Sequence, residues 1–137
     1  MFRGFTTISY FADDLDAAAA WYTEFLGVAP YFRSGDGYVE FRIGDYQHEL
    51  GIVNRKYVPG HESAGGVLMY WAVDDLEAVV ARLLALGATA HLPITSRGDG
   101  YVTASVYDPF GNILGVMTNQ HYLDVLATIS AQPAPRS

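Results

Sequence analysis

The chain has 137 residues, which suits one compact domain, and it contains no cysteine, which excludes disulfides, thiol nucleophiles and cysteine-based metal sites. Its net charge of −7, with only 8 Lys and Arg residues, argues against nucleic acid as a partner. It has neither the pattern of a signal peptide nor an apolar run near the roughly 20 residues of a membrane helix, so we expect a cytoplasmic protein with no membrane partner.

The first half of the chain predicts a strand, a helix and two further strands. Apolar residues recur at helical spacing over residues 15–26, with Asp13 as the expected N-cap and Gly27 as the stop signal. Runs of alternating, β-branched or aromatic residues predict strands at 5–11, 38–43 and 46–53.

The second half repeats this order. The pentapeptide Gly-Asp-Gly-Tyr-Val occurs at residues 35–39 and again at 98–102. A helix is predicted over residues 76–86, with Asp74 and Glu77 as its capping pair. Strands are predicted at 67–73, 101–107 and 113–118, with a short strand near Ile94 and a last short helix at 122–129.

The repeat predicts two similar modules, each with the order βαβββ, and therefore an α+β fold. The expected boundaries are a first module at 1–57, a linker at 58–66, a second module at 67–119, and a C-terminal short helix with a frayed tail at 120–137. A chain built from two copies of one unit is expected to place a site between them.

Alternation gives the strands at 38–43 and 101–107 two different faces. The face expected to meet the helices holds Val39, Phe41, Ile43, Val102, Ala104 and Val106. The opposite face holds Tyr38, Glu40, Arg42, Tyr101, Thr103 and Ser105. Such a polar and aromatic wall is typical of a ligand pocket, although a merely solvated face would show the same alternation.

Several motifs carry a family resemblance. The motifs are Asp-Asp-Leu at 74–76, Leu-Gly-Ala at 86–88, Asp-Pro-Phe-Gly-Asn at 108–112, and the related residues of the first half at 14–15 and 21–27. Over residues 4–119 the chain resembles the glyoxalase/bleomycin-resistance/extradiol-dioxygenase superfamily, also called vicinal oxygen chelate. This resemblance implies two tandem βαβββ modules that form a curled mixed sheet around a concave cavity, commonly in a homodimer.

The resemblance also implies a divalent metal held by His and Glu side chains, and here the chain departs from the family. The residues at the family's ligand positions are Thr7, Gly51, Leu68 and Gly115. Glycine and leucine offer no side-chain ligand and one hydroxyl is weak alone, so we expect neither a metal nor another cofactor. A displaced metal site at His48 and Glu49 is an alternative, but adjacent strand residues point to opposite faces.

We therefore expect a metal-independent small-molecule binding protein that sequesters a drug or metabolite. Glu49 and Tyr70 share strand parity with the family's ligand positions and join the expected cavity wall. The complete wall is Tyr38, Glu40, Arg42, Glu49, Tyr70, Tyr101, Thr103 and Ser105. Arg42 would favour an anionic ligand and the two glutamates a cationic one.

Two other hypotheses remain. One is a lyase, isomerase or dioxygenase-like enzyme of the same fold, with Glu49 as base or with a relocated metal site. The other is an interaction module with a vestigial cavity. Trp71 is expected to pack under a helix, and His61, His91 and His121 to have surface or capping roles. Ser105 has no His–acid partner visible in the sequence, which gives no support to nucleophilic catalysis.

Overall fold

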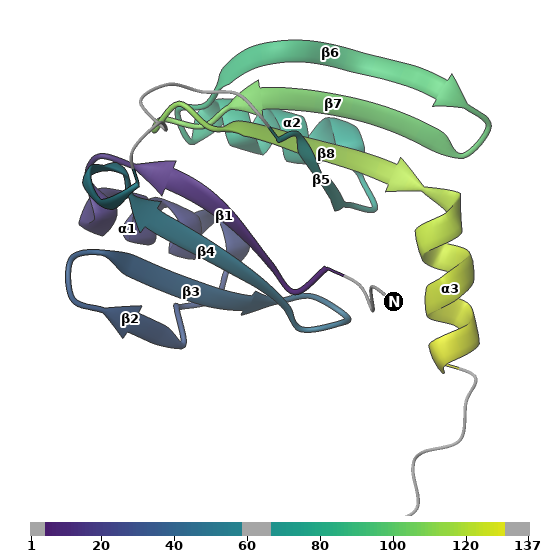
Figure 1. Ribbon diagram of the computed structural model, residues 1–137. Helices are drawn as coiled ribbons and strands as arrows, with labels where there is room; N and C mark the ends of the chain where they lie inside the picture. Colours follow the sequence, from purple (N-terminus) through teal and green to yellow (C-terminus); the bar gives the residue numbers. More distant parts are fainter. Residues whose placement is uncertain (1–4, 59–66, 131–137) are drawn as a thin grey trace, which may run out of the picture.

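The computed structural model describes residues 5–58 and 67–130, which form eight strands and three α-helices (Figure 1). In chain order the elements are β1 (Thr7–Ala12), α1 (Leu15–Leu26), β2 (Phe32–Ser34), β3 (Tyr38–Ile43), β4 (His48–Asn54), a short 3₁₀ helix (Arg55–Tyr57), β5 (Met69–Ala72), α2 (Leu76–Ala85), β6 (Thr89–Gly98), β7 (Tyr101–Tyr107), β8 (Ile113–Asn119) and α3 (Gln120–Ser130).

The strands form two curled, open sheets with the same topology. Their orders are β1-β4-β3-β2 and β5-β8-β7-β6. In each sheet the first strand of the module pairs in parallel with the last, and the other pairs are antiparallel. The predicted α+β fold of two tandem βαβββ modules is therefore confirmed.

Aspartate side chains cap both module helices, one residue later than predicted. Asp14 and Asp75 each accept a hydrogen bond from the backbone N–H three residues further on, at 3.0 and 3.1 Å. The predicted caps Asp13 and Asp74 precede these residues and lie outside the helices. Each helix begins after a pair of adjacent aspartates, so composition alone could not select the capping one. Gly27 ends α1 in the left-handed conformation (φ 74°), as predicted.

The strands at the outer edges of the two sheets differ most from the prediction. The predicted βαβββ order includes β2, but no residue range was assigned to it, because its three residues are exposed and carry no alternation. β6 extends over ten residues and includes Pro93, whereas only a short strand near Ile94 was expected. Proline is tolerated there because β6 lies at the sheet edge and its register with β7 is irregular.

α3 confirms the helix predicted near the end of the chain, although it begins at Gln120. The expected tail at 131–137 and most of the expected linker, residues 59–66, lie outside the described residues. Within residues 5–58 and 67–130, no helix has both the length and the apolar character needed to cross a membrane.

The two modules share one hydrophobic core on the helix-facing sides of their sheets. The six side chains predicted to meet the helices all belong to it: Val39, Phe41, Ala104 and Val106 are buried, and Ile43 and Val102 pack against them. Tyr22 Oη of α1 donates a hydrogen bond to Asp108 Oδ2 at 2.5 Å, and Trp21 Nε1 donates to the Leu86 carbonyl at 2.8 Å. Both bonds join one module to the other, so the opposite face of each sheet points away from this core.

Candidate functional site

Five side chains on the outer face of the first sheet form one polar cluster, which we call the β3–β4 cluster: Tyr31, Tyr38, Glu40, Arg42 and Glu49. Tyr38 Oη donates a hydrogen bond to Glu40 Oε1 at 2.5 Å. Tyr31 Oη lies within hydrogen-bond reach of Glu40 and at 2.7 Å from Glu49 Oε2. Arg42 pairs with Glu49 at 3.2 Å, and its guanidinium carbon lies 4.1 Å from the centre of the Tyr31 ring.

The strand geometry explains why these side chains meet. Alternation along β3 places residues 38, 40 and 42 on one face. Arg42 stands directly opposite Glu49 in the antiparallel pairing of β3 with β4, the arrangement in which opposite charges stabilise a sheet. Four of the eight predicted site residues are thus brought together by the register of two strands.

The carboxyl group of Glu40 is the most perturbed acid of the β3–β4 cluster. Partial burial raises the pKa of Glu40, the nearby Glu49 raises it further, and Arg42 acts against this shift. Burial and the charge of Glu49 also raise the pKa of the Tyr38 phenol. With two carboxylates and one guanidinium, the cluster favours a ligand that is cationic or donates hydrogen bonds.

Tyrosine rings occupy the space of the family's last-strand metal ligands. The ring of Tyr38 covers Gly51, and a Cβ atom at Gly51 would collide with it. The ring of Tyr70 covers Gly115 in the same way in the second sheet. A side-chain ligand at Gly51 would therefore require Tyr38 to move away. At Gly115 it would require both Tyr70 and the Met69 backbone carbonyl to move, since that oxygen would lie 2.7 Å from the new Cβ.

The displaced metal site at His48 and Glu49 does not fit the geometry either. The His48 ring stacks on Tyr46 at a centroid distance of 5.6 Å, whereas Glu49 turns to Arg42. Across the described part of the chain, no three His, Asp or Glu side chains gather as a metal ion requires. The residues present do not fit the metal that the family resemblance implies.

The other predicted site residues lie on the second sheet. Thr103 Oγ1 accepts a hydrogen bond from Arg97 Nε at 3.1 Å, and Ser105 Oγ lies 2.8 Å from His91 Nδ1. The expectation of a surface or capping role for His91 was wrong, because this ring is half-buried against β7. Ser105 is 2% exposed, so its hydroxyl is not accessible as a nucleophile even though it has a histidine partner.

Arg97 and His91 were not identified from the sequence because β6 was not recognised as a long strand. Both lie on β6, whose register with β7 shifts at several points, so simple alternation could not have placed their side chains even with the full strand known. The full extent of β6 was not recognised from the sequence, because Pro93 argues against a continuous strand at this point.

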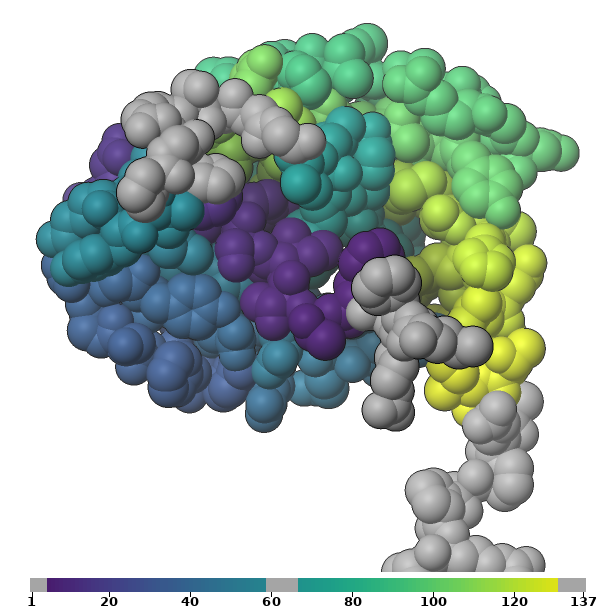
Figure 2. Space-filling view, in the orientation of Figure 1, coloured from purple at the N-terminus to yellow at the C-terminus, as the bar shows by residue number. Residues whose placement is uncertain are grey.

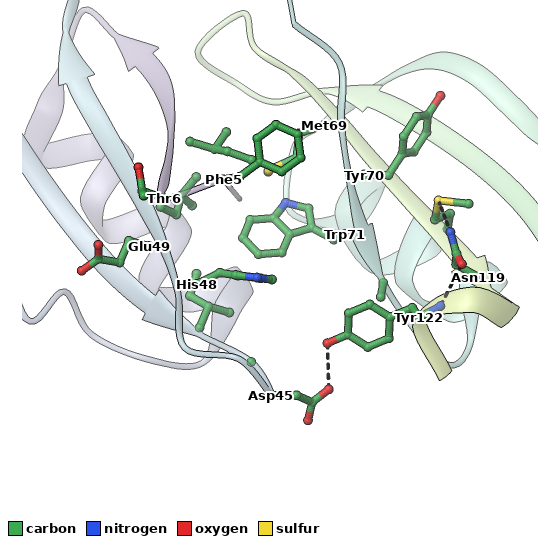
Figure 3. A pocket seen from close by; sticks show the side chains of 16 residues that line it. Phe5, Thr6, Asp45, His48, Glu49, Met69, Tyr70, Trp71, Asn119 and Tyr122 are labelled. Carbon is green, nitrogen blue, oxygen red and sulfur yellow. Dashed lines mark hydrogen bonds between the residues drawn. The ribbon is translucent and has the colours of Figure 1, made fainter. Parts of the chain in front are cut away.

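The eight predicted residues therefore form two separate sets, one on each sheet. The first set is Tyr38, Glu40, Arg42 and Glu49, and the second is Tyr70, Tyr101, Thr103 and Ser105. Only Glu49 and Tyr70 line the cavity of about 340 Å³ that lies between the modules (Figure 3).

Other side chains of this cavity were missed by the sequence analysis. Trp71 packs against the core, as expected, but its ring also lines the cavity. Asp45 and Tyr122 meet there from the β3–β4 turn and from α3, with 2.9 Å between Oδ2 and Oη. No local pattern connects residues 45 and 122, so only the tertiary structure could bring them together.

Comparison with known proteins agrees with this fold. The family model of the Glyoxalase/Bleomycin resistance protein/Dioxygenase superfamily matches residues 4–116. No curated protein matches this chain in sequence. Among solved structures, a glyoxalase-related enzyme from Fulvimarina pelagi is 23% identical, with a TM-score of 0.70, and the match covers 87% of this chain and 90% of that one.

Two further structures show the same architecture. Lactoylglutathione lyase from Agrobacterium tumefaciens is 22% identical, with a TM-score of 0.68 and coverage of 87% of this chain and 96% of that one. FosX, a fosfomycin resistance protein from Listeria monocytogenes complexed with Mn(II) and sulfate, is 16% identical, with a TM-score of 0.69 and coverage of 87% and 92%. At these identities the likeness concerns the fold, whereas the family model spans most of the sequence. The chain therefore belongs to the glyoxalase/bleomycin resistance protein/dioxygenase superfamily, as its motifs predicted.

Proposed function

We propose that this protein binds a small organic molecule without a metal, at the β3–β4 cluster, and thereby sequesters a drug or metabolite. The observation that carries this proposal is the position of Tyr38. Its ring covers Gly51, where the family would place a metal ligand, and its hydroxyl is hydrogen-bonded to Glu40. The site offers phenol and carboxylate groups already held in place, which reduces the entropy lost on binding.

The ligand class follows from the groups that remain available. Arg42 is engaged by Glu49 and stacks on Tyr31, so an anionic ligand would have to displace an existing ion pair. The carboxylates favour amino or hydroxyl donors. The exposed Phe32 ring beside the cluster, and the face of the Tyr31 ring that Arg42 does not cover, are available to a planar ligand, worth about 0.5–1.5 kcal/mol per stacked pair beyond area burial.

A second copy of the chain is proposed to cover these open faces in a homodimer. The first sheet exposes the acidic β3–β4 cluster, and the second sheet carries the guanidinium group of Arg97 on β6. In a two-fold dimer that joins the first module of one copy to the second module of the other, these opposite charges attract. Light scattering should give twice the monomer mass, and Arg97→Glu should weaken the dimer. A monomeric wild type at micromolar concentration would contradict this arrangement.

The test of binding uses protein dialysed against EDTA and a thermal-shift screen of aromatic amines and polyols. A ligand at 100 times its Kd adds about 2.7 kcal/mol of stability, enough to detect. Affinities of the compounds that bind are then measured by calorimetry for wild type, Glu40→Gln and the control Glu77→Gln, an exposed glutamate on α2. Losing one hydrogen bond to a charged group costs about 1.5–3 kcal/mol, so we expect Glu40→Gln to bind about 10–100 times more weakly.

Other outcomes would overturn the proposal. Binding that appears only after Mn²⁺ or Zn²⁺ is added would restore a metal-dependent function. Binding that is unchanged in Glu40→Gln and in Arg42→Gln would place the ligand away from the β3–β4 cluster.

The raised pKa of Glu40 favours one alternative, a lyase or isomerase that uses a carboxylate of this cluster as base. Glu49, the base expected from the sequence, forms an ion pair with Arg42, whereas Glu40 is bonded to the phenols of Tyr31 and Tyr38, so Glu40 is the better candidate. Turnover that rises with pH through the titration of Glu40 and is lost in Glu40→Gln would support the enzyme. Binding without any turnover supports sequestration.

A further inference from the structure

The cavity between the modules is separate from most of the β3–β4 cluster. Its walls come from the start of β1, the β3–β4 turn, β4, β5, β8 and α3. Figure 2 shows the surface hollowed between the start of β1, in purple, and the segment of β8 and α3, in yellow. Glu49 is the one residue of the cluster that reaches it.

Apolar side chains form most of the wall. Ile8 and Leu50 come from the first module, and Met69 and Trp71 from β5 of the second. In the close-up the indole ring of Trp71 stands between His48 and Met69, in the middle of the lining side chains (Figure 3). A volume of about 340 Å³ lies at the lower end of the range for small-ligand sites, roughly 300–1,000 Å³. The ligand must therefore be compact, with one ring and a short chain.

The polar groups that line the cavity determine which charge its ligand can carry. None of the described residues that line it is Lys or Arg, whereas Asp45 and Glu49 both contribute carboxylates. Arg42 neutralises Glu49, but no salt bridge in the described ranges engages Asp45. An anionic ligand would meet repulsion from Asp45, and an ammonium group would meet attraction together with nearby aromatic rings.

A contact between α3 and the β3–β4 turn holds Asp45 at the edge of this cavity. Tyr122 Oη donates a hydrogen bond to Asp45 Oδ2 at 2.9 Å, drawn as a dashed line in Figure 3. The Tyr122 ring also packs edge-on against Tyr46, with 5.6 Å between the ring centroids. Because Tyr122 donates to Oδ2, the other carboxylate oxygen of Asp45 remains available to a further partner.

We propose that this cavity is a second binding site, for a compact arylalkylamine that packs its ring on Trp71 and places its ammonium group beside Asp45. The site shares only Glu49 with the β3–β4 cluster and goes beyond the binding function proposed above. It takes its ligand between the two modules, where side chains of β4, β5 and α3 meet.

Three probes of equal length test the charge and shape of the site: 4-phenylbutylamine, 4-phenylbutan-1-ol and 4-phenylbutanoate. Calorimetry at pH 7 should give the amine a Kd near or below about 1 mM, with the alcohol about tenfold weaker and the carboxylate weaker still. The amine should change the tryptophan fluorescence, and Trp71→Phe should abolish this change. An equal affinity for all three probes, or a preference for the carboxylate, would overturn the proposal.

Variants locate the site. Asp45→Asn should remove the preference for the amine over the alcohol while leaving the alcohol bound. Ala72→Phe and Thr6→Trp fill the cavity from exposed positions on opposite sides, and each should weaken all three probes at least fivefold. Circular dichroism and thermal melts confirm that each variant is folded. Amine binding that survives both filling variants would overturn the proposal.

Glu40→Gln separates this proposal from the function proposed above. It should leave 4-phenylbutylamine binding unchanged while it weakens ligands of the β3–β4 cluster. If Glu40→Gln instead weakens the amine and Asp45→Asn does not, the amine binds on the outer sheet face and the second site is refuted.

Discussion

The phenol ring of Tyr38 lies over Gly51, in the space that a side chain at position 51 would occupy. Gly51 stands opposite Glu40 in the pairing of β3 with β4, so the ring reaches it along a diagonal of the sheet. Tyr70 covers Gly115 in the second sheet, where the two residues are direct partners of β5 and β8. Glycine and tyrosine are therefore coupled in both modules, and a metal ligand cannot be restored by changing the glycine alone.

Gly51→Ala should destabilise the protein, because the new methyl group collides with the Tyr38 ring. Overpacking of this kind costs about 1–3 kcal/mol, measured as the free energy of unfolding in urea. Gly37→Ala is the matched control, since its Cβ would meet the Tyr57 ring at an ordinary contact distance of 3.5 Å. Adding Tyr38→Ala to Gly51→Ala should recover part of the loss. A Gly51→Ala protein as stable as Gly37→Ala would contradict the packing.

Tyr22→Phe should lower the free energy of unfolding, because it weakens the packing interface between the two modules. Tyr22 is fully buried, and its hydroxyl donates to Asp108, which also accepts from Asn112 Nδ2 at 2.7 Å. Removing the hydroxyl leaves a buried carboxylate oxygen with one partner fewer, at a cost of about 1–3 kcal/mol.

The control for that variant is Tyr57→Phe. Tyr57 is 55% exposed and donates to Asp36 at 2.8 Å, so water can replace its bond. Tyr57→Phe should lower the free energy of unfolding by no more than about 0.5 kcal/mol. Equal effects of the two variants in chemical denaturation would show that the Tyr22–Asp108 bond does not stabilise the fold.

The sequence was sufficient for those features that depend on local pattern. Alternation in β3 and β7 predicted which side chains meet the helices, and the Asp-Pro-Phe-Gly-Asn turn at 108–112 predicted the family. The β3–β4 cluster also follows from local pattern, because Tyr38, Glu40 and Arg42 share a strand face and pair across to the next strand.

Features that depend on long-range packing could not be predicted in this way. The contact of Asp45 with Tyr122 joins a turn of the first module to a helix after the second, and no spacing rule connects them. His91 meets Ser105 only because β6 continues through Pro93 along the sheet edge. The cavity between the modules depends on how two separately predictable units pack, which sequence periodicity does not describe.

The pKa of Glu40 should respond to its two charged neighbours in opposite directions. Burial and the negative charge of Glu49 raise this pKa, and the positive charge of Arg42 lowers it. Arg42→Gln should therefore raise the pKa of Glu40 further, and Glu49→Gln should bring it closer to the ordinary value. Titration followed by NMR of the Glu40 side chain carboxyl measures both shifts. Shifts in the same direction would show that the charges of Arg42 and Glu49 do not control the pKa of Glu40.

Alkaline stability should reveal the contact of α3 with the β3–β4 turn. Burial, aided by the hydrogen bond to Asp45, raises the pKa of Tyr122 to about 12. The folded state therefore keeps this proton after the unfolded chain has lost it near the ordinary tyrosine pKa of 10.0, so stability falls as pH rises from about 10 to 12. Tyr10 and Tyr22 also have raised pKa values and act in the same direction, so the difference between wild type and Tyr122→Phe isolates the contribution of Tyr122.

Wild type should therefore lose more stability than Tyr122→Phe when thermal melts at pH 9 and pH 11 are compared. Asp45→Asn should lower the pKa of Tyr122, seen as earlier phenolate absorbance near 295 nm, because the anion that disfavours phenolate formation is gone. If wild type and Tyr122→Phe lose the same stability between pH 9 and pH 11, α3 does not hold the β3–β4 turn in solution. Asp45 would then lack the support that keeps its carboxylate at the edge of the cavity, and the amine preference should be lost with it.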